Sequence, residues 1–282
     1  MSLVVAIVAP GNMGAAVARR LTENGVEVLT ALAGRGAASV ARAAAAGMRD
    51  VPLDGLIRAE LVLSILPPGH ALAFAEQMAP VLSAAAVRKP VFVDCNAVSP
   101  ETVRRIGAVV AGAGAPFVDA SIIGLPPKPG QPSPHFYVSG ESAARVLALS
   151  AYGLDVRVLD GAVGAASALK MSYAGINKGV AALAAAMILA AGRAGATEAL
   201  YQEMSESLPG LLESLRRQVP DMLPKTYRWV AEMREIAAFA GEDAATRAVF
   251  EGFSELFARI SQDVEGEKRE SGVLTGFFQT RK

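Results

Sequence analysis

The sequence predicts an α/β fold in the first part of the chain and an all-helical fold in the second. Up to residue 161, short β-branched runs alternate with alanine-rich segments of helical spacing, which is the pattern of a parallel sheet covered by crossover helices. From residue 163 to residue 193 no proline interrupts a helical pattern, and no later segment resembles a strand. We therefore expect a doubly wound domain at residues 1–161 and a helical domain at residues 162–282.

The expected strands are short runs rich in valine, leucine and isoleucine that lie between turn residues. They cover residues 3–9, 26–32, 60–66, 91–95, 116–120, 135–139 and 155–158. Helices are expected between them at residues 13–23, 37–46, 70–82, 100–113 and 141–151. Residues 163–193 would form one long interdomain helix, followed by helical stretches at 196–218, 226–239 and 244–264. Pro209, Pro220 and Pro224 with Gly241 would break these stretches. The polar end, residues 265–282, is expected to be partly mobile.

The composition argues against several classes of protein. Lysine and arginine total 27, and aspartate and glutamate total 27, so no net field would hold a nucleic acid. One cysteine, Cys95, and two histidines, His70 and His135, cannot form a disulfide or a zinc cluster, and no metal site is expected. The chain starts without the pattern of a secretory signal, and its longest apolar run, residues 179–192, is shorter than the roughly 20 residues of a membrane span. These features predict a cytoplasmic protein.

The run Ala9-Pro10-Gly11-Asn12-Met13-Gly14 follows the first expected strand and opens the first expected helix, which is the position of a dinucleotide-binding fingerprint. In that motif, glycines permit a tight turn, a close approach of the backbone to the pyrophosphate, and close contact between helix and strand. Gly11 and Gly14 would fill the last two roles, whereas Ala9 replaces the first glycine. We expect Pro10 to Gly14 to bind a nicotinamide dinucleotide in a Rossmann-type domain, the alternative being a βα turn that binds nothing.

The end of the second strand predicts which dinucleotide binds. NAD-binding domains place an acidic residue about 20 positions beyond the fingerprint, where it holds the ribose hydroxyls. Here no acid occurs between Glu27 and Asp50, and Arg35 follows the strand. A 2′-phosphate would meet no carboxylate there, and Arg35 offers it a planar fork of donors. We therefore expect NADP (NADPH) rather than NAD, unless Arg35 is an ordinary solvated loop residue.

Together with the fingerprint, four further segments resemble the β-hydroxyacid dehydrogenases, the family of 3-hydroxyisobutyrate and 6-phosphogluconate dehydrogenases. They are the run Leu63-Ser64-Ile65-Leu66-Pro67-Pro68, the turn Asp94-Cys95-Asn96-Ala97-Val98-Ser99-Pro100, the loop Asp119-Ala120-Ser121-Ile122-Ile123-Gly124, and residues 164–170, which open the long helix. The C-terminal part, with residues 225–233, looks like a less characterised branch of this family. The resemblance implies an oxidoreductase that moves hydride between nicotinamide and a carbinol or carbonyl carbon.

The resemblance also implies roles for individual residues. Lys170 matches the lysine that such enzymes use as general acid and base, a task that requires an amine whose pKa is lowered by burial. The alternative is a lysine whose ammonium group reaches solvent along a buried stem. Leu66 and Pro67 would lie beside the cofactor, and Asn96 would hold the nicotinamide ribose or a substrate group unless it only forms a turn.

Two positions depart from the family pattern at the substrate end. Ala174 stands where the family carries an asparagine, so Tyr173 or Asn177, on the same helix face as Lys170, would have to replace it. The family's Ser-Gly-Gly loop is here Ile123-Gly124-Leu125, and Ile123 cannot donate a hydrogen bond. We expect a hydroxyacid-like or less polar substrate. The expected substrate-binding residues are Ser121, Ile122, Ile123, Gly124, Tyr173 and Asn177, with Lys128 and Lys178 as further candidates.

Two alternatives to a dehydrogenase remain open. Imine reductases share this architecture and reduce a C=N bond, although they usually carry an aspartate or tyrosine at the position of Lys170. A regulator that binds NADP without turnover is the other alternative. His70 and His135 are expected to be capping or surface residues. The alanine-rich faces of the long helix would expose a large apolar area in a monomer, so we expect a homodimer through the C-terminal helices.

Overall fold

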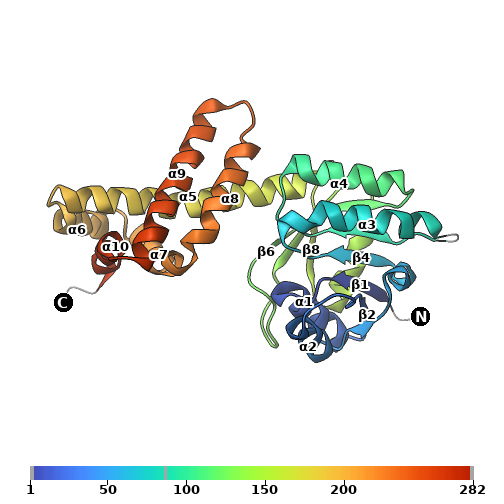
Figure 1. Cartoon of the computed structure of the whole chain (residues 1–282). Helices are drawn as coiled ribbons and strands as arrows, with labels where there is room; N and C mark the ends of the chain where they lie inside the picture. The colour runs from blue at the N-terminus through green and yellow to red at the C-terminus, as the bar shows by residue number, and fades with distance from the viewer. Residues whose placement is uncertain (1–2, 86–87, 280–282) are drawn as a thin grey trace. The chain divides into compact units, whose positions relative to one another are not determined.

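The computed structural model of the protein describes residues 3–85 and 88–279. The chain divides into two compact units, residues 1–170 and residues 171–282, coloured from blue to yellow-green and from yellow to red in Figure 1. The boundary between the units falls inside the long helix, whereas the sequence analysis placed it just before that helix.

An eight-stranded sheet forms the centre of the first unit, in the order β3-β2-β1-β4-β5-β6-β7-β8. Its strands are β1 (Val4–Val8), β2 (Glu27–Thr30), β3 (Arg49–Asp50), β4 (Leu61–Ser64), β5 (Val91–Asp94), β6 (Phe117–Ile123), β7 (His135–Ser139) and β8 (Asp155–Val158). Neighbouring strands run parallel except β6 and β7. The sheet is therefore parallel, as predicted, except between β6 and β7, which residues 124–134 join without a crossover helix.

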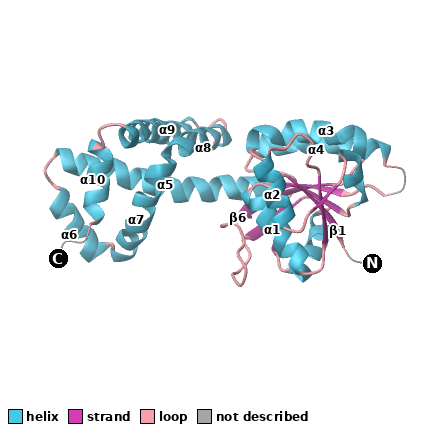
Figure 2. Ribbon diagram, turned by 60° about the horizontal axis from the view of Figure 1, so that its bottom comes forward, coloured by secondary structure: helices cyan, strands magenta, loops and turns pink. Residues whose placement is uncertain are grey.

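Helices cover both faces of this sheet, as expected for a doubly wound domain (Figure 2). Residues at alternate strand positions pack into two separate hydrophobic cores, one on each face of the sheet. Val5 and Ile7 lie in one core, and Ala6 and Val8 lie in the other. The first core is closed by α1 (Asn12–Glu23), α2 (Ala37–Ala45) and the 3-10 segment η3 (Ala143–Tyr152). The second core is closed by η1 (Leu53–Arg58), α3 (Ala71–Ala84), which follows η2 (Pro68–His70), and α4 (Pro100–Gly112). η3 lies where a helix was expected, but with tighter geometry.

The second unit is helical and has its own apolar core. Its elements are the later part of α5 (Ala165–Arg193), then α6 (Thr197–Ser207), α7 (Pro209–Met222), η4 (Leu223–Lys225), α8 (Thr226–Phe239), α9 (Ala244–Glu265) and α10 (Arg269–Phe278). α8 and α9 lie side by side (Figure 1), where Trp229 meets Phe257 edge to face at 5.3 Å. The helical stretch expected at residues 196–218 is two helices, and the break lies at the predicted Pro209, where the chain leaves helical geometry at Leu208 and Pro209 starts α7.

The prediction that residues 265–282 are partly mobile is wrong for residues 269–278, which form α10. Leu274, Phe277 and Phe278 are buried in the core of the second unit. The carboxylate of Asp263 accepts hydrogen bonds from the Ser271 N–H and hydroxyl, both at 2.7 Å, and so fixes the start of the helix. Residues 280–282 lie outside the described part of the chain.

The helix α5 is long and apolar enough to cross a membrane, by length and composition alone, with a mean hydropathy of 1.6 over its most apolar window. In the structure, 39% of that window is buried inside the protein. A long apolar helix of this kind is also typical of the interior of a folded protein that never meets a lipid.

Candidate active site

The turn between β1 and α1 has the geometry of a phosphate-binding turn. A Cβ atom at Gly14 would lie 2.1 Å from the carbonyl oxygen of Ala9, so only glycine allows α1 to approach the strand this closely. A Cβ atom at Gly11 would meet no described atom within 4 Å, so open space lies in front of the helix N-terminus. Gly11 is the N-cap of α1, where no described side chain occupies the N–H donors. These observations fit the pyrophosphate of a dinucleotide and the roles predicted for both glycines.

The turn closes without the family's first glycine. The Gly11 N–H donates to the carbonyl oxygen of Ala9 at 2.8 Å, and the Ala9 N–H donates to that of Ile65 at 3.1 Å. From α2, Arg42 donates through Nε to the Pro10 carbonyl at 2.9 Å and through Nη2 to the Ser39 hydroxyl at 3.0 Å. Sequence analysis missed Arg42, since only the folding of α2 against the turn brings it to Pro10.

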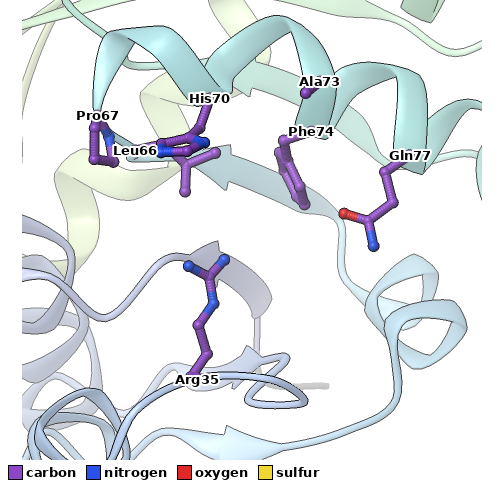
Figure 3. Close-up of a pocket in the computed structure, with 7 residues that line it drawn as sticks. All are labelled: Arg35, Leu66, Pro67, His70, Ala73, Phe74 and Gln77. Carbon is purple, nitrogen blue, oxygen red and sulfur yellow. The ribbon is translucent and has the colours of Figure 1, made fainter.

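A cavity of about 280 Å³ lies between the loop after β2 and the start of α3 (Figure 3). Its lining residues are Arg35, Leu66, Pro67, His70, Ala73, Phe74 and Gln77. It thus brings together three residues that the sequence analysis assigned to the cofactor, and the Arg35 guanidinium points across it toward Leu66 and His70 (Figure 3). His70 occupies the N-cap position of α3, but its side chain makes no capping hydrogen bond and faces the cavity instead.

A carboxylate does reach the end of β2, although none follows that strand directly in the sequence. Asp50 lies on β3, next to β2, and its Oδ1 accepts a hydrogen bond from the Leu32 N–H at 2.9 Å. The two-residue strand β3 is too short for its pattern to be recognised, so this placement of Asp50 was not predicted. Asp50 serves the backbone of the loop, and in the described part of the chain no ion pair joins it to Arg35.

Asn96 is buried and links the ends of β4 and β5. Its Oδ1 accepts a hydrogen bond from the Leu66 N–H at 2.6 Å, and its Nδ2 donates to the Ser64 hydroxyl at 2.8 Å and to Asp94. Both amide hydrogens are therefore engaged within the protein. The contribution of Asn96 to the predicted cofactor site is to hold the turn at Leu66 and Pro67, which line the cavity.

Asp119, in the middle of β6, anchors the first turn of α5. Its Oδ2 accepts hydrogen bonds from the Gly164 N–H at 2.9 Å, the Ser167 N–H at 3.1 Å and the Ser139 hydroxyl at 3.1 Å. Its Oδ1 accepts from the Ser167 hydroxyl at 2.7 Å. Lys170 lies three residues after Ser167 on the same side of α5, so Asp119 fixes the helical turn that carries the predicted catalytic lysine. The motif was recognised in the sequence, but this role of its aspartate was not.

Asp94 ends β5 and is almost fully buried. Burial raises the pKa of its carboxyl group to about 7, with the charge of Asp119 acting in the same direction, while hydrogen bonds from Asn96 and the charge of Lys170 oppose the rise. Its Oδ2 has no hydrogen-bond partner among the described residues. The half-buried Lys170 thus acts electrostatically on a carboxyl group that changes charge near neutral pH.

The predicted substrate residues of β6 divide between the two faces of the sheet. Ser121 lies on the same face as Asp119, and its buried hydroxyl has no hydrogen-bond partner within the described residues. Ile122 packs into the opposite core, away from Asp119 and Ser121, so its side chain does not reach the site. Ile123 is half-buried, and Gly124 turns the chain with a φ of +133°, a conformation that favours glycine.

The further candidate Lys128 is exposed in the first unit, between β6 and β7, whereas the other predicted substrate residues belong to the second unit. Tyr173 is 52% exposed and Asn177 is also exposed on α5. Lys178, a further candidate, forms an ion pair with Glu232 and lies over the ring of Trp229 at 5.5 Å from the centroid. Its charge is therefore already compensated within the second unit.

Comparison with known families agrees with this geometry. Residues 4–147, just over half of the chain, match the family described as the NAD binding domain of 6-phosphogluconate dehydrogenase. Residues 191–260 match a domain of unknown function, DUF1932. The chain therefore belongs to the β-hydroxyacid dehydrogenase-like family, and its first unit is a dinucleotide-binding domain of the oxidoreductase type. A search of curated proteins gave no match.

Solved structures show the same fold along nearly the whole chain. A conserved protein of unknown function, described as structurally similar to 3-hydroxyacid dehydrogenases, is 29% identical, with a TM-score of 0.79 over 93% of this chain and 98% of its own. A conserved hypothetical protein from Sinorhizobium meliloti is 26% identical, with a TM-score of 0.76 over 98% and 97%. A Mycobacterium tuberculosis 3-hydroxyisobutyrate dehydrogenase is 20% identical, with a TM-score of 0.70 over 98% and 99%, and this likeness concerns the fold.

Proposed function

We propose that the protein is an NADP-dependent oxidoreductase that transfers hydride between nicotinamide and a carbinol or carbonyl carbon. The observation that carries this proposal is the arrangement within one unit. The open glycine turn follows β1, and the cavity with Arg35 lies beyond β2 and β4. Asp119 holds the helix that carries Lys170, and the charge of Lys170 acts on the buried Asp94. In doubly wound folds, ligands bind at this carboxyl edge of the strands.

The cofactor, when bound, would supply or accept the hydride, and the side chains of the site would handle the proton. In the direction of reduction, the Lys170 ammonium group donates a proton to the carbonyl oxygen, and in the direction of oxidation the neutral amine accepts the hydroxyl proton. Asp119 holds the first turn of α5 and thereby positions Lys170. Ser121, whose buried hydroxyl has no hydrogen-bond partner among the described residues, is proposed to donate to a substrate oxygen.

The proposed cofactor preference rests on Arg35. Its guanidinium is exposed at the cavity, where no lining residue is acidic. An imine reductase from Myxococcus stipitatus that shares the fold at 18% identity was solved with NADP⁺, and a variant of it was solved with NAD⁺. The fold therefore accepts both dinucleotides, and the choice of NADP in this chain is proposed from its own residues.

The proposed substrate is a small hydroxyacid-like or less polar molecule. Ile123 removes one hydrogen-bond donor that the family's loop offers, which leaves Ser121 as the polar group of that segment. Tyr173 and Asn177, both accessible on α5, are proposed to supply the missing asparagine's hydrogen bond.

Reduction of a C=N bond is the second candidate. A reductive aminase from Aspergillus terreus, solved in complex with NADPH, shares the fold at 19% identity with a TM-score of 0.55. Hydride transfer to an imine carbon needs the same cofactor position, and Lys170 would protonate the nitrogen instead of an oxygen. A regulator that binds NADPH without turnover is the third candidate. An assay of NADPH oxidation distinguishes it from the two enzymes, because a regulator would not oxidise the cofactor.

The test is NADPH oxidation by the purified protein with panels of small carbonyl and imine substrates. Replacing Lys170 with alanine should lower turnover about 10²- to 10⁴-fold through the loss of acid–base catalysis. Lys225→Ala, a substitution in η4 outside the proposed site, serves as the control and should retain activity. Full activity in the Lys170→Ala variant would remove the proposed role of the lysine.

We infer further that the protein acts as a cytoplasmic homodimer through α5. On the part of α5 within the second unit, exposed apolar side chains recur at alternating intervals of three and four residues. They are Tyr173, Ile176, Val180, Leu183 and Met187. This spacing is the a/d repeat by which a helix pairs with a copy of itself. Leu183, which is 56% exposed, lies between Val180 and Met187 in this stripe.

The inferred dimer can be tested by the mass of the protein in solution. Leu183→Lys should convert a dimer into a monomer, because a charge would be buried in the contact. Leu147→Lys places the same change on η3, in the first unit, and should leave the mass unchanged. A monomeric mass of the unaltered protein would contradict the inference.

A further inference from the structure

His70 and Arg35 approach the same cavity from opposite sides, His70 from the start of α3 and Arg35 from the loop after β2 (Figure 3). Within residues 3–85 and 88–279, neither side chain is engaged in a hydrogen bond or an ion pair. The amide of Gln77 is the remaining polar side chain among the lining residues, and Leu66 and Phe74 supply apolar surface. Such a lining suits a ligand with an anionic group beside a planar apolar body.

We propose that His70 is a second recognition residue for the 2′-phosphate of NADPH, which it contacts from the side opposite Arg35. This inference rests on the proposed function of the site. A phosphate monoester carries a charge of about −1.5 to −2 at pH 7, whereas one guanidinium supplies a single positive charge. An imidazole donates an N–H to the phosphate in its neutral form and adds a positive charge in its protonated form.

Two charged groups near the turn and the loop after β2 already bind the backbone of these segments. The guanidinium of Arg42 donates to the Pro10 carbonyl and to the Ser39 hydroxyl, so its donors serve the turn and the start of α2. The carboxylate of Asp50 accepts from the Leu32 N–H. Arg35 and His70 are therefore the basic side chains that remain available at the cavity, and no acid among its lining residues opposes an anion.

His70 is also suited to a clean substitution test. Its side chain is exposed and does not cap α3, and only its backbone N–H contributes to the turn, by donating to the Pro67 carbonyl at 2.9 Å. A change of the side chain should therefore leave the fold intact. His135, the second histidine, is paired with Asp155 at 2.8 Å on the far strands of the sheet and provides a matched control.

The experiment measures the affinity of the full chain for NADPH and NADH by calorimetry, with 2′,5′-ADP and 5′-AMP as adenosine probes. His70→Ala should weaken NADPH and 2′,5′-ADP about tenfold, the effect of losing one charge-assisted hydrogen bond, and leave NADH and 5′-AMP within twofold. His70→Lys should restore NADPH binding, whereas His70→Phe should not. His135→Ala should behave as the unaltered protein.

An equal loss of NADPH and NADH in His70→Ala, restored in His70→Phe, would mean that the ring stacks on the adenine, and would overturn the proposal. Unchanged affinities for all four ligands would overturn it as well. If the unaltered protein binds NADPH while His70→Ala behaves normally, only this inference fails. If the unaltered protein binds neither dinucleotide, the proposed function fails, and this inference with it.

Discussion

Replacing Asp94 with asparagine should remove a strong dependence of stability on pH. The native pKa of about 7 lies some three units above the ordinary value of 3.8, because the carboxyl is buried. A group whose native pKa is raised contributes stability that is fully present below the unfolded pKa and is lost as pH rises through the native pKa. Three units correspond to about 4 kcal/mol in total, of which about 3 kcal/mol is lost between pH 5 and pH 8.

Asparagine is the appropriate replacement because it mimics the protonated acid. Its Oδ1 can accept the hydrogen bonds that Asn96 donates to Asp94, and it carries no charge at any pH. The assay is urea-induced unfolding of the native chain and Asp94→Asn at pH 5 and pH 8. The free energy of unfolding of the native chain, minus that of Asp94→Asn, should be about 3 kcal/mol lower at pH 8 than at pH 5.

The exposed Asp160 provides a control, since Asp160→Asn should show no comparable difference. If the difference in free energy of unfolding between the native chain and Asp94→Asn is the same at both pH values, the buried carboxyl is ionised from pH 5 to pH 8. Lys170 would then face a fixed negative charge, and the inference that the Asp94 carboxyl changes charge near neutral pH would be wrong.

Two further predictions concern the elements that build the site. Gly14→Ala should weaken NADPH binding at least 100-fold or prevent folding, since its Cβ would lie 2.1 Å from the Ala9 carbonyl oxygen. Gly11→Ala, whose Cβ would face open space, should fold normally, as measured by circular dichroism. Equal folding and equal NADPH binding in both variants would contradict this prediction. Asp119→Asn should lower the free energy of unfolding by about 1–3 kcal/mol, because a neutral amide oxygen would replace the charged carboxylate oxygen that accepts from the Gly164 and Ser167 N–H groups. Unfolding in urea measures this loss, and native stability in Asp119→Asn would show that the anchor of α5 lies elsewhere.

Much of the fold was predictable because its signals are local in the sequence. The β7 and β8 boundaries and those of α8 agree with the predicted ranges, since turn residues or prolines delimit each run. The antiparallel β7 could not be predicted, because a strand has the same alternation in either direction. α10 was missed because its polar flanks outweighed an apolar pattern of only Leu274, Phe277 and Phe278.

The candidate site was predictable where a residue's role depends on backbone geometry. Gly11 and Gly14 follow from the spacing of the fingerprint, and the structure gives both the expected surroundings. The residues that sequence analysis missed act across long separations in the chain. Arg42 reaches Pro10 from 32 positions away, and His70 lines the same cavity as Arg35 only when β4 is inserted beside β1. Such contacts depend on tertiary packing, which one sequence without its fold does not contain.

The most direct test of the proposed function is the thermal stability of the purified protein with an excess of NADPH and, separately, of NADH. A ligand at 100 times its Kd should stabilise the native state by about 2.7 kcal/mol. We expect a clear rise in Tm with NADPH and a smaller rise or none with NADH at the same concentration, because Arg35 and the absence of acids at the cavity favour the 2′-phosphate. An unchanged Tm with both dinucleotides would contradict the proposed oxidoreductase function, and an equal rise with both would contradict the preference for NADP.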